Sequence, residues 1–137
     1  MGFVKNYNET DVLARWNYSH EEWKHFLRWK LLRKSFIHYF IHLLKPNRKR
    51  TPEVIITHER VWIDECHEPF HTGDRQLKCI NIRDAGKINV MEITYEQQHP
   101  KGTFNNDIRI PVPKGKLREA IDVEEKLNMI RNFNQRG

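Results

Sequence analysis

The fold of this chain is decided at residues 54–63, which read VIITHERVWI. Residues 54–57 and 61–63 are short runs of β-branched and aromatic side chains, which are typical of strands. Residues 58–60 separate the two runs and are all polar, so the segment predicts a β-hairpin. The turn of this hairpin lacks the usual glycine, and the sequence leaves its type open.

Three more strands are predicted after the hairpin, at residues 77–83, 87–96 and 106–112. In the middle one the inward-facing set shifts near Val90, which predicts a β-bulge there. Pro111 and Pro113 place the end of the last strand at a sheet margin, because neither residue can donate a ladder hydrogen bond. Residues 53–113 are therefore predicted to form an antiparallel sheet.

A strand and a long helix are predicted before the hairpin. Residues 12–18 alternate apolar and polar side chains, as a strand with one buried face does. A helix is predicted over residues 20–44, because Ser19 and Glu22 have the spacing of a capping box and Pro46 disfavours helical geometry before it. The second half of this helix is apolar on nearly every side, so we expect a sheet, a partner chain or lipid to cover it.

The chain ends in a third kind of pattern, because residues 114–133 have apolar side chains at helical spacing and predict a C-terminal helix. The order strand, long helix, five strands, helix is an α+β layout with an antiparallel sheet. A length of 137 residues suits a single domain over residues 1–137.

The net charge of +6 is distributed unevenly. It is +7 over residues 1–52, −3 over residues 53–113 and +2 over residues 114–137. The basic excess therefore lies in the N-terminal third and the sheet region is mildly acidic. This distribution weakens the case for a general nucleic-acid binder, because the basic excess is confined to a helix and linker whose neighbouring residues are strongly apolar.

Cysteine usage and hydropathy bear on the compartment. Two cysteines cannot build a disulfide-rich scaffold, and residues 1–7 lack the apolar core of a secretory signal. No apolar stretch of about 18 residues free of charge is present, so the chain as given is not expected to span a bilayer. We expect a cytoplasmic protein, peripheral to or tethered at the inner membrane if its long helix binds lipid.

The order of elements resembles that of the bacterial pleckstrin-homology-like domains over residues 53–130. The resemblance is carried by the hairpin at 54–63, by IRIPVPKG at 108–115 and by the apolar residues that enter the last helix. These last residues are Leu117, Ala120 and Ile121. The resemblance implies a curved antiparallel sheet closed at one end by a C-terminal helix.

A subset of these families is more similar still, since it places one strand and a long helix before the main sheet. The helix there leads into a membrane hairpin, and WNYSHEEW at residues 16–23 would be the strand-to-helix junction. No second apolar run follows residue 44, so we expect either a soluble relative or a chain that lacks its membrane segment. The family's functions are mostly unassigned, so the resemblance implies a fold and no catalytic residues.

One cluster has the residue types of a metal site. Cys66, His67 and His71 place three zinc-type ligands within six residues. Zinc usually takes four ligands, and Cys79 or His58 would complete the set only if folding brought one of them near. A solvated loop without a cofactor is the favoured interpretation, and a metal-dependent enzyme that uses this cluster is a minor alternative.

No catalytic motif stands out elsewhere in the chain. The six glycines are scattered, and no nucleophile elbow, P-loop or H-E-x-x-H pair is present. We therefore expect a non-catalytic binding or regulatory module that interacts through the helix at 20–44.

Two sets of residues in and after this helix are the predicted interaction residues. The contact residues are Trp23, Phe26, Trp29, Phe36, Phe40, Ile41 and Leu44. The electrostatic residues are Arg28, Arg33, Lys34, Arg48, Lys49 and Arg50. Packing on its own sheet or on a second copy ranks first as the role of this helix, an anionic membrane surface second and nucleic acid third.

Overall fold

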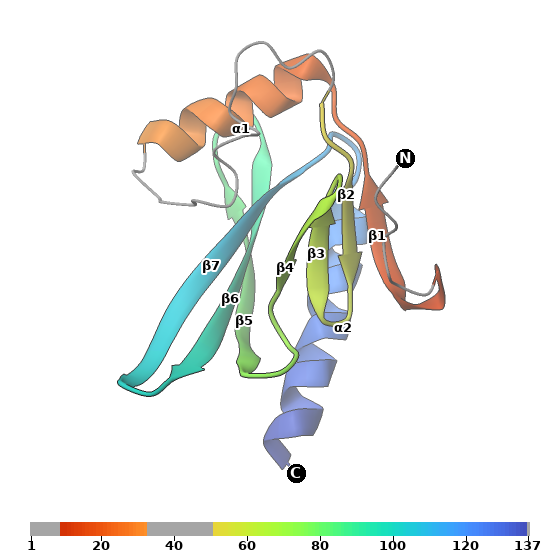
Figure 1. Ribbon diagram of the computed structural model, residues 1–137. Coiled ribbons are helices and arrows are strands. Elements are labelled where there is room, and N and C mark those ends of the chain that lie inside the picture. The colour runs from red at the N-terminus through yellow and green to blue at the C-terminus, as the bar shows by residue number, and fades with distance from the viewer. Residues whose placement is uncertain (1–8, 33–50, 137) are drawn as a thin grey trace.

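The computed structural model describes residues 9–32 and 51–136, which form an α+β fold with two antiparallel sheets and two long helices (Figure 1). Sheet A contains β1 (Val12–Trp16), β2 (Val54–Thr57), β3 (Arg60–Ile63) and β4 (Cys66–Pro69), in that order. Sheet B contains β5 (Arg75–Asp84), β6 (Asn89–His99) and β7 (Gly102–Val112). The helices are α1 (His20–Leu32) and α2 (Leu117–Arg136), and a short 3-10 turn at Glu9–Asp11 precedes β1.

The predicted α+β class and antiparallel pairing are confirmed, but the strands divide between two sheets rather than one. β1 joins β2 across a long sequence separation, with Trp16 opposite Val54, and both side chains are buried. Of the helix predicted over residues 20–44, α1 extends to Leu32, and residues 33–44 lie outside the described part of the chain.

The hairpin of β2 and β3 closes without a glycine because Thr57 supplies the missing contacts. Its hydroxyl donates to the Arg60 carbonyl at 3.0 Å and accepts the Arg60 amide at 3.2 Å. The Glu59 amide also points to this hydroxyl, at 3.4 Å. A short polar side chain that bonds the nearby backbone is an established way to hold a turn.

The β-bulge predicted near Val90 is wrong. β6 pairs with β7 without interruption along its whole length, and the register shift in sheet B lies in β5, between Leu77 and Cys79. Val90 and Met91 face opposite sides of β6, yet both are fully buried. The central strand of sheet B is covered on both faces here, so apolar residues follow one another without any change of register.

β4 occupies part of the segment for which a solvated loop is predicted. It pairs antiparallel with β3, with Glu68 opposite Val61. Asp64 makes the preceding turn at φ 52°, a left-handed conformation that Asp tolerates better than most residues. The Asp64 carboxylate accepts the Glu53 amide at 2.9 Å, which fastens this turn to the start of β2.

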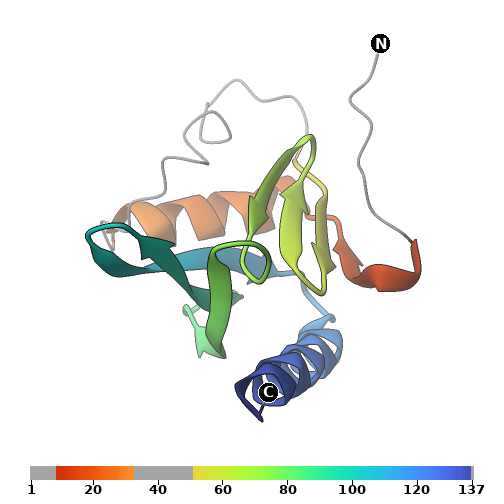
Figure 2. The same cartoon turned by 60° about the horizontal axis from the view of Figure 1, so that its bottom comes forward.

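α2 closes the core against both sheets and lies on a different side of the strands from α1 (Figure 2). Its Ala120, Val123 and Leu127 are fully buried, and its contacts run along β5 and reach β1. Trp16 in β1 is buried too, and its indole Nε1 donates to the Glu119 carboxylate at 3.0 Å. The C-terminal helix α2 therefore connects β1 of sheet A with β5 of sheet B.

Candidate functional site

The start of α1 is held by the predicted capping box, which the hydrogen bonds confirm. The Glu22 amide donates to Ser19 Oγ at 3.1 Å, and the Ser19 amide donates to Glu22 Oε1 at 2.8 Å. The second carboxylate oxygen of Glu22 accepts the amide of Lys114, in the loop between β7 and α2. Burial raises the pKa of Glu22, but the hydrogen bonds from Ser19 and Lys114 outweigh it, and the pKa lies below its ordinary value.

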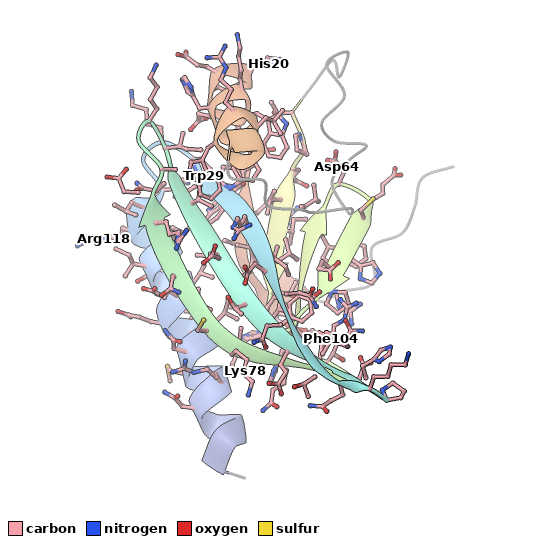
Figure 3. The ribbon with its side chains drawn as sticks, turned by 90° about the vertical axis from the view of Figure 1, so that its left-hand side faces the viewer. His20, Trp29, Asp64, Lys78, Phe104 and Arg118 are labelled. Atoms are coloured by element: carbon pink, nitrogen blue, oxygen red, sulfur yellow. The ribbon has the colours of Figure 1, made fainter. Side chains whose placement is uncertain are left out.

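The apolar side of α1 packs on the protein itself. Trp23 and Phe26 are 8% and 2% exposed, and their ring centroids lie 5.3 Å apart. Trp29 is half-buried and continues this row at 6.2 Å from Phe26, between α1 and the strands of sheet B (Figure 3). The Arg109 guanidinium of β7 lies 6.0 Å from the Trp29 ring centroid. Three of the seven predicted contact residues are thus already in contact with their own chain.

The other side of α1 is exposed and carries two basic residues, together with Glu21 in the first turn. Lys24 and Arg28 lie one helical turn apart, and both are exposed. Within the described residues, neither helix is long and apolar enough to cross a bilayer. The remaining predicted residues lie outside the described part of the chain, namely Phe36, Phe40, Ile41, Leu44, Arg33, Lys34, Arg48, Lys49 and Arg50.

A cavity of about 570 Å³ lies beside the capped end of α1. Its walls come from three distant segments: the first turns of α1, the turn between β5 and β6, and the loop from β7 into α2. Lys87 and Lys114 enter it from the last two of these segments. The sequence did not indicate this cavity, because its walls come together only through the pairing of β6 with β7 and the hydrogen bond from the Lys114 amide to Glu22 of α1.

The predicted metal ligands do not converge. His67 stacks on Trp62, with ring centroids 4.7 Å apart, and its Nδ1 lies 3.3 Å from Nη1 of Arg60. His71 Nδ1 instead accepts the Leu77 amide at 3.2 Å. Among the residues that the structure describes, no group of three or more His, Cys, Asp and Glu side chains is placed to hold a metal ion.

The contacts of His67 with Arg60 and of His71 with the Leu77 amide both require an Nδ1 that accepts a hydrogen bond. An arginine or a backbone amide can only donate, so Nδ1 of His67 and of His71 must each carry a lone pair. Burial lowers the pKa of His67, and the nearby Arg60 lowers it further. Burial also lowers the pKa of His71, although Glu59 opposes this effect. The lowered pKa and the donor at Nδ1 both favour the neutral imidazole for each side chain in the folded protein.

This arrangement makes the folded state sensitive to acid. Below about pH 6.5 the unfolded chain binds protons that the folded chain resists, so the free energy of unfolding is expected to fall between about pH 7 and pH 5. Urea unfolding across this range measures the slope. His67→Gln and His71→Gln are expected to flatten it, whereas His20→Gln, at the exposed start of α1, is expected to leave it unchanged. A slope that both variants retain would contradict the assignment.

A second polar cluster was not predicted from the sequence and holds β4 against sheet B. Glu68 is 7% exposed, and its Oε1 accepts hydrogen bonds from Arg75 in β5 and from the Tyr95 hydroxyl in β6. Arg75 also donates to the Pro69 carbonyl at 2.9 Å, and its guanidinium lies 5.1 Å from the Tyr95 ring centroid. The contacts of this cluster are internal to the chain, which assigns it a structural role.

The whole chain was compared with models of protein families, with curated proteins and with solved structures. None of the three comparisons found a match.

Proposed function

We propose that this protein is a non-catalytic binding module that attaches to an anionic membrane surface through the exposed side of α1. The single observation that carries the proposal is the division of α1 into two sides. Trp23 and Phe26 are buried in the core, while Lys24 and Arg28 remain exposed. Because the aromatic rings of α1 are packed in the core, its charged side chains are the ones available to a partner. A cation near an anionic membrane surface contributes about 1 kcal/mol to the free energy of binding.

The same observation lowers the rank of self-association through this helix. A stable interface between copies needs apolar side chains at its centre. In the described part of α1 the large apolar side chains Trp23 and Phe26 are occupied by the chain's own core. Packing on its own sheet, one of the alternatives that the sequence left open, accounts for them without a partner.

A non-catalytic role is supported by the contacts of three carboxylates, of which Glu68 and Glu92 are buried. Glu22 fastens α1 to the β7–α2 loop, and Glu68 fastens β4 to sheet B. Glu92 is 8% exposed and accepts Arg109 Nε at 2.7 Å, which links β6 to β7. Each of these carboxylates has a structural partner that a catalytic acid or base would have to give up.

We also propose that the chain is a pleckstrin-homology-like domain. The support is architectural: a four-stranded and a three-stranded antiparallel sheet are followed by a helix that closes the core. On this proposal the protein is cytoplasmic and peripheral to the inner membrane, and it needs no cofactor.

Sedimentation with vesicles tests the proposed function. The full chain is expected to sediment with vesicles that contain phosphatidylglycerol, but not with vesicles of phosphatidylcholine alone, and to be released by salt. The double variant Lys24→Gln/Arg28→Gln loses two surface cations and is expected to bind roughly thirtyfold more weakly.

The matched control is Lys101→Gln/Lys126→Gln, which removes the same charge from exposed positions away from α1. Its binding is expected to stay close to that of the unaltered chain. Equal losses in both double variants would mean that net charge, and not the surface of α1, decides binding. A salt-sensitive mobility shift of generic DNA without any vesicle binding would instead favour the nucleic-acid alternative.

A further inference from the structure

One lysine lies on each chain segment just beyond the open end of the β6–β7 ladder. The last residue pair there is Asn89 with Val112. Lys87 lies two residues before Asn89 and Lys114 two residues after Val112, so they occupy equivalent places on the two chain segments. Both are exposed and both line the cavity beside α1. The cavity therefore receives one lysine from each of these two segments.

The carboxylates of the same cavity are engaged elsewhere. Glu22 uses one oxygen for the Ser19 amide and the other for the Lys114 amide. Glu21 lies 3.5 Å from His25, one turn further along α1. These groups keep the formal charge of the cavity low, and the charge of Lys114 also helps to lower the pKa of Glu22.

The cavity also has an apolar wall. Val112 and Pro113 are buried beneath it, and Ile88 is half-buried at its side. Leu117, the first residue of α2, is 43% exposed at its edge, although its side chain is large and apolar. A volume of about 570 Å³ is within the usual range for small-molecule sites.

We infer that this cavity binds a small organic anion, whose carboxylate or phosphate group bridges Lys87 and Lys114 and whose apolar body lies on Ile88, Val112 and Leu117. The bound oxyanion forms charge-assisted hydrogen bonds with both lysines. The apolar body covers the exposed side chain of Leu117. Glu21 and Glu22 disfavour a polyanion, so the ligand carries one oxyanion group.

Binding of phenyl phosphate to the full chain, measured by isothermal titration calorimetry, tests this site. Phenyl phosphate is expected to bind more tightly than inorganic phosphate, and phenol is expected not to bind. Benzoate in a parallel titration distinguishes a carboxylate ligand from a phosphate ligand, and pyrophosphate is expected to bind no more tightly than phosphate. No detectable binding of phenyl phosphate or benzoate to the folded protein would overturn the proposal.

Variants locate the site. Lys87→Gln and Lys114→Gln are each expected to weaken the better-bound of the two aromatic anions about tenfold, the loss typical of one charge-assisted hydrogen bond. Leu117→Ala is expected to weaken it about fivefold while leaving inorganic phosphate unchanged. The matched control Lys101→Gln, in the turn at the opposite end of the same hairpin, is expected to bind normally.

Loss of ligand affinity in Lys101→Gln equal to that in Lys87→Gln would also refute the site. The inference goes beyond the proposed membrane role, and these titrations use neither vesicles nor variants of α1, so the two proposals can fail separately.

Discussion

Replacing Glu68 with alanine is expected to lower the free energy of unfolding by about 3–5 kcal/mol, the cost of breaking a buried ion pair by removing one partner. The Glu68 side chain is only 8% exposed, and its Oε1 accepts both Arg75 and the Tyr95 hydroxyl. Alanine leaves the guanidinium of Arg75 near the core without its carboxylate. Urea unfolding at neutral pH, followed by tryptophan fluorescence, measures the loss.

Two milder variants separate charge from shape at this site. Glu68→Gln keeps the acceptor oxygen and is expected to cost less than alanine, and Tyr95→Phe removes one hydrogen bond at about 1 kcal/mol. Glu68, Arg75 and Tyr95 share one hydrogen-bond network. The double variant Glu68→Gln/Tyr95→Phe is therefore expected to lose less stability than the sum of the two single losses. If the free energy of unfolding of Glu68→Ala lies within about 0.5 kcal/mol of that of the unaltered chain, the cluster does not hold β4 in place.

β4 shows what the sequence could not predict. Cys66, His67, Glu68 and Pro69 have little preference for strands and no apolar alternation, so local residue preferences indicate a loop. The strand exists because β3 pairs with it and because sheet B supplies Arg75 and Tyr95 to a buried carboxylate. Only the contact with Tyr95 joins segments distant in the chain, since β3 and Arg75 are near neighbours of β4. The strand could not be predicted because the side chains of residues 66–69 lack the pattern of a strand.

Local signals were read correctly where they are complete within a few residues. The capping box of Ser19 and Glu22 needs only its own first turn, and the structure contains both hydrogen bonds. The hairpin at residues 54–63 likewise forms between adjacent runs. The prediction of a bulge at Val90 was wrong. The consecutive apolar residues there arise because this central strand is buried on both faces, and not from a change of register.

The candidate site was only partly predictable for the same reason. Helical spacing on α1 indicates that Trp23 and Phe26 share an apolar side, but it does not say whether that side meets the chain's own sheet or a partner. The exposed positions of Lys24 and Arg28 follow from the same spacing. Lys87 and Lys114 carry no signal in the sequence, because only the register of Asn89 with Val112 relates them.

Replacing Trp16 with alanine is expected to lower the free energy of unfolding by about 3–5 kcal/mol, which is typical for truncating a buried aromatic residue. Trp16 is 1% exposed and is one of the largest fully buried side chains of the described core. Its indole also reaches Glu119 of α2 at 3.0 Å, so the variant weakens both the pairing of β1 and the docking of the C-terminal helix. Urea unfolding measures the total loss, and amide hydrogen exchange in β1 and α2 shows where it acts.

The two contributions of Trp16 can be separated because its hydrogen bond and its packing involve different partners. Glu119→Ala removes the acceptor but keeps the ring, and is expected to cost about 1 kcal/mol. Phe104→Ala truncates an aromatic residue that is 52% exposed at the outer end of the β6–β7 hairpin, and is expected to cost less than about 0.5 kcal/mol. If Trp16→Ala costs no more than Phe104→Ala, β1 is not part of the cooperative core. A large loss confined to Trp16→Ala, with faster exchange in α2 as well as in β1, is the result expected if the first strand and the last helix form one folding unit.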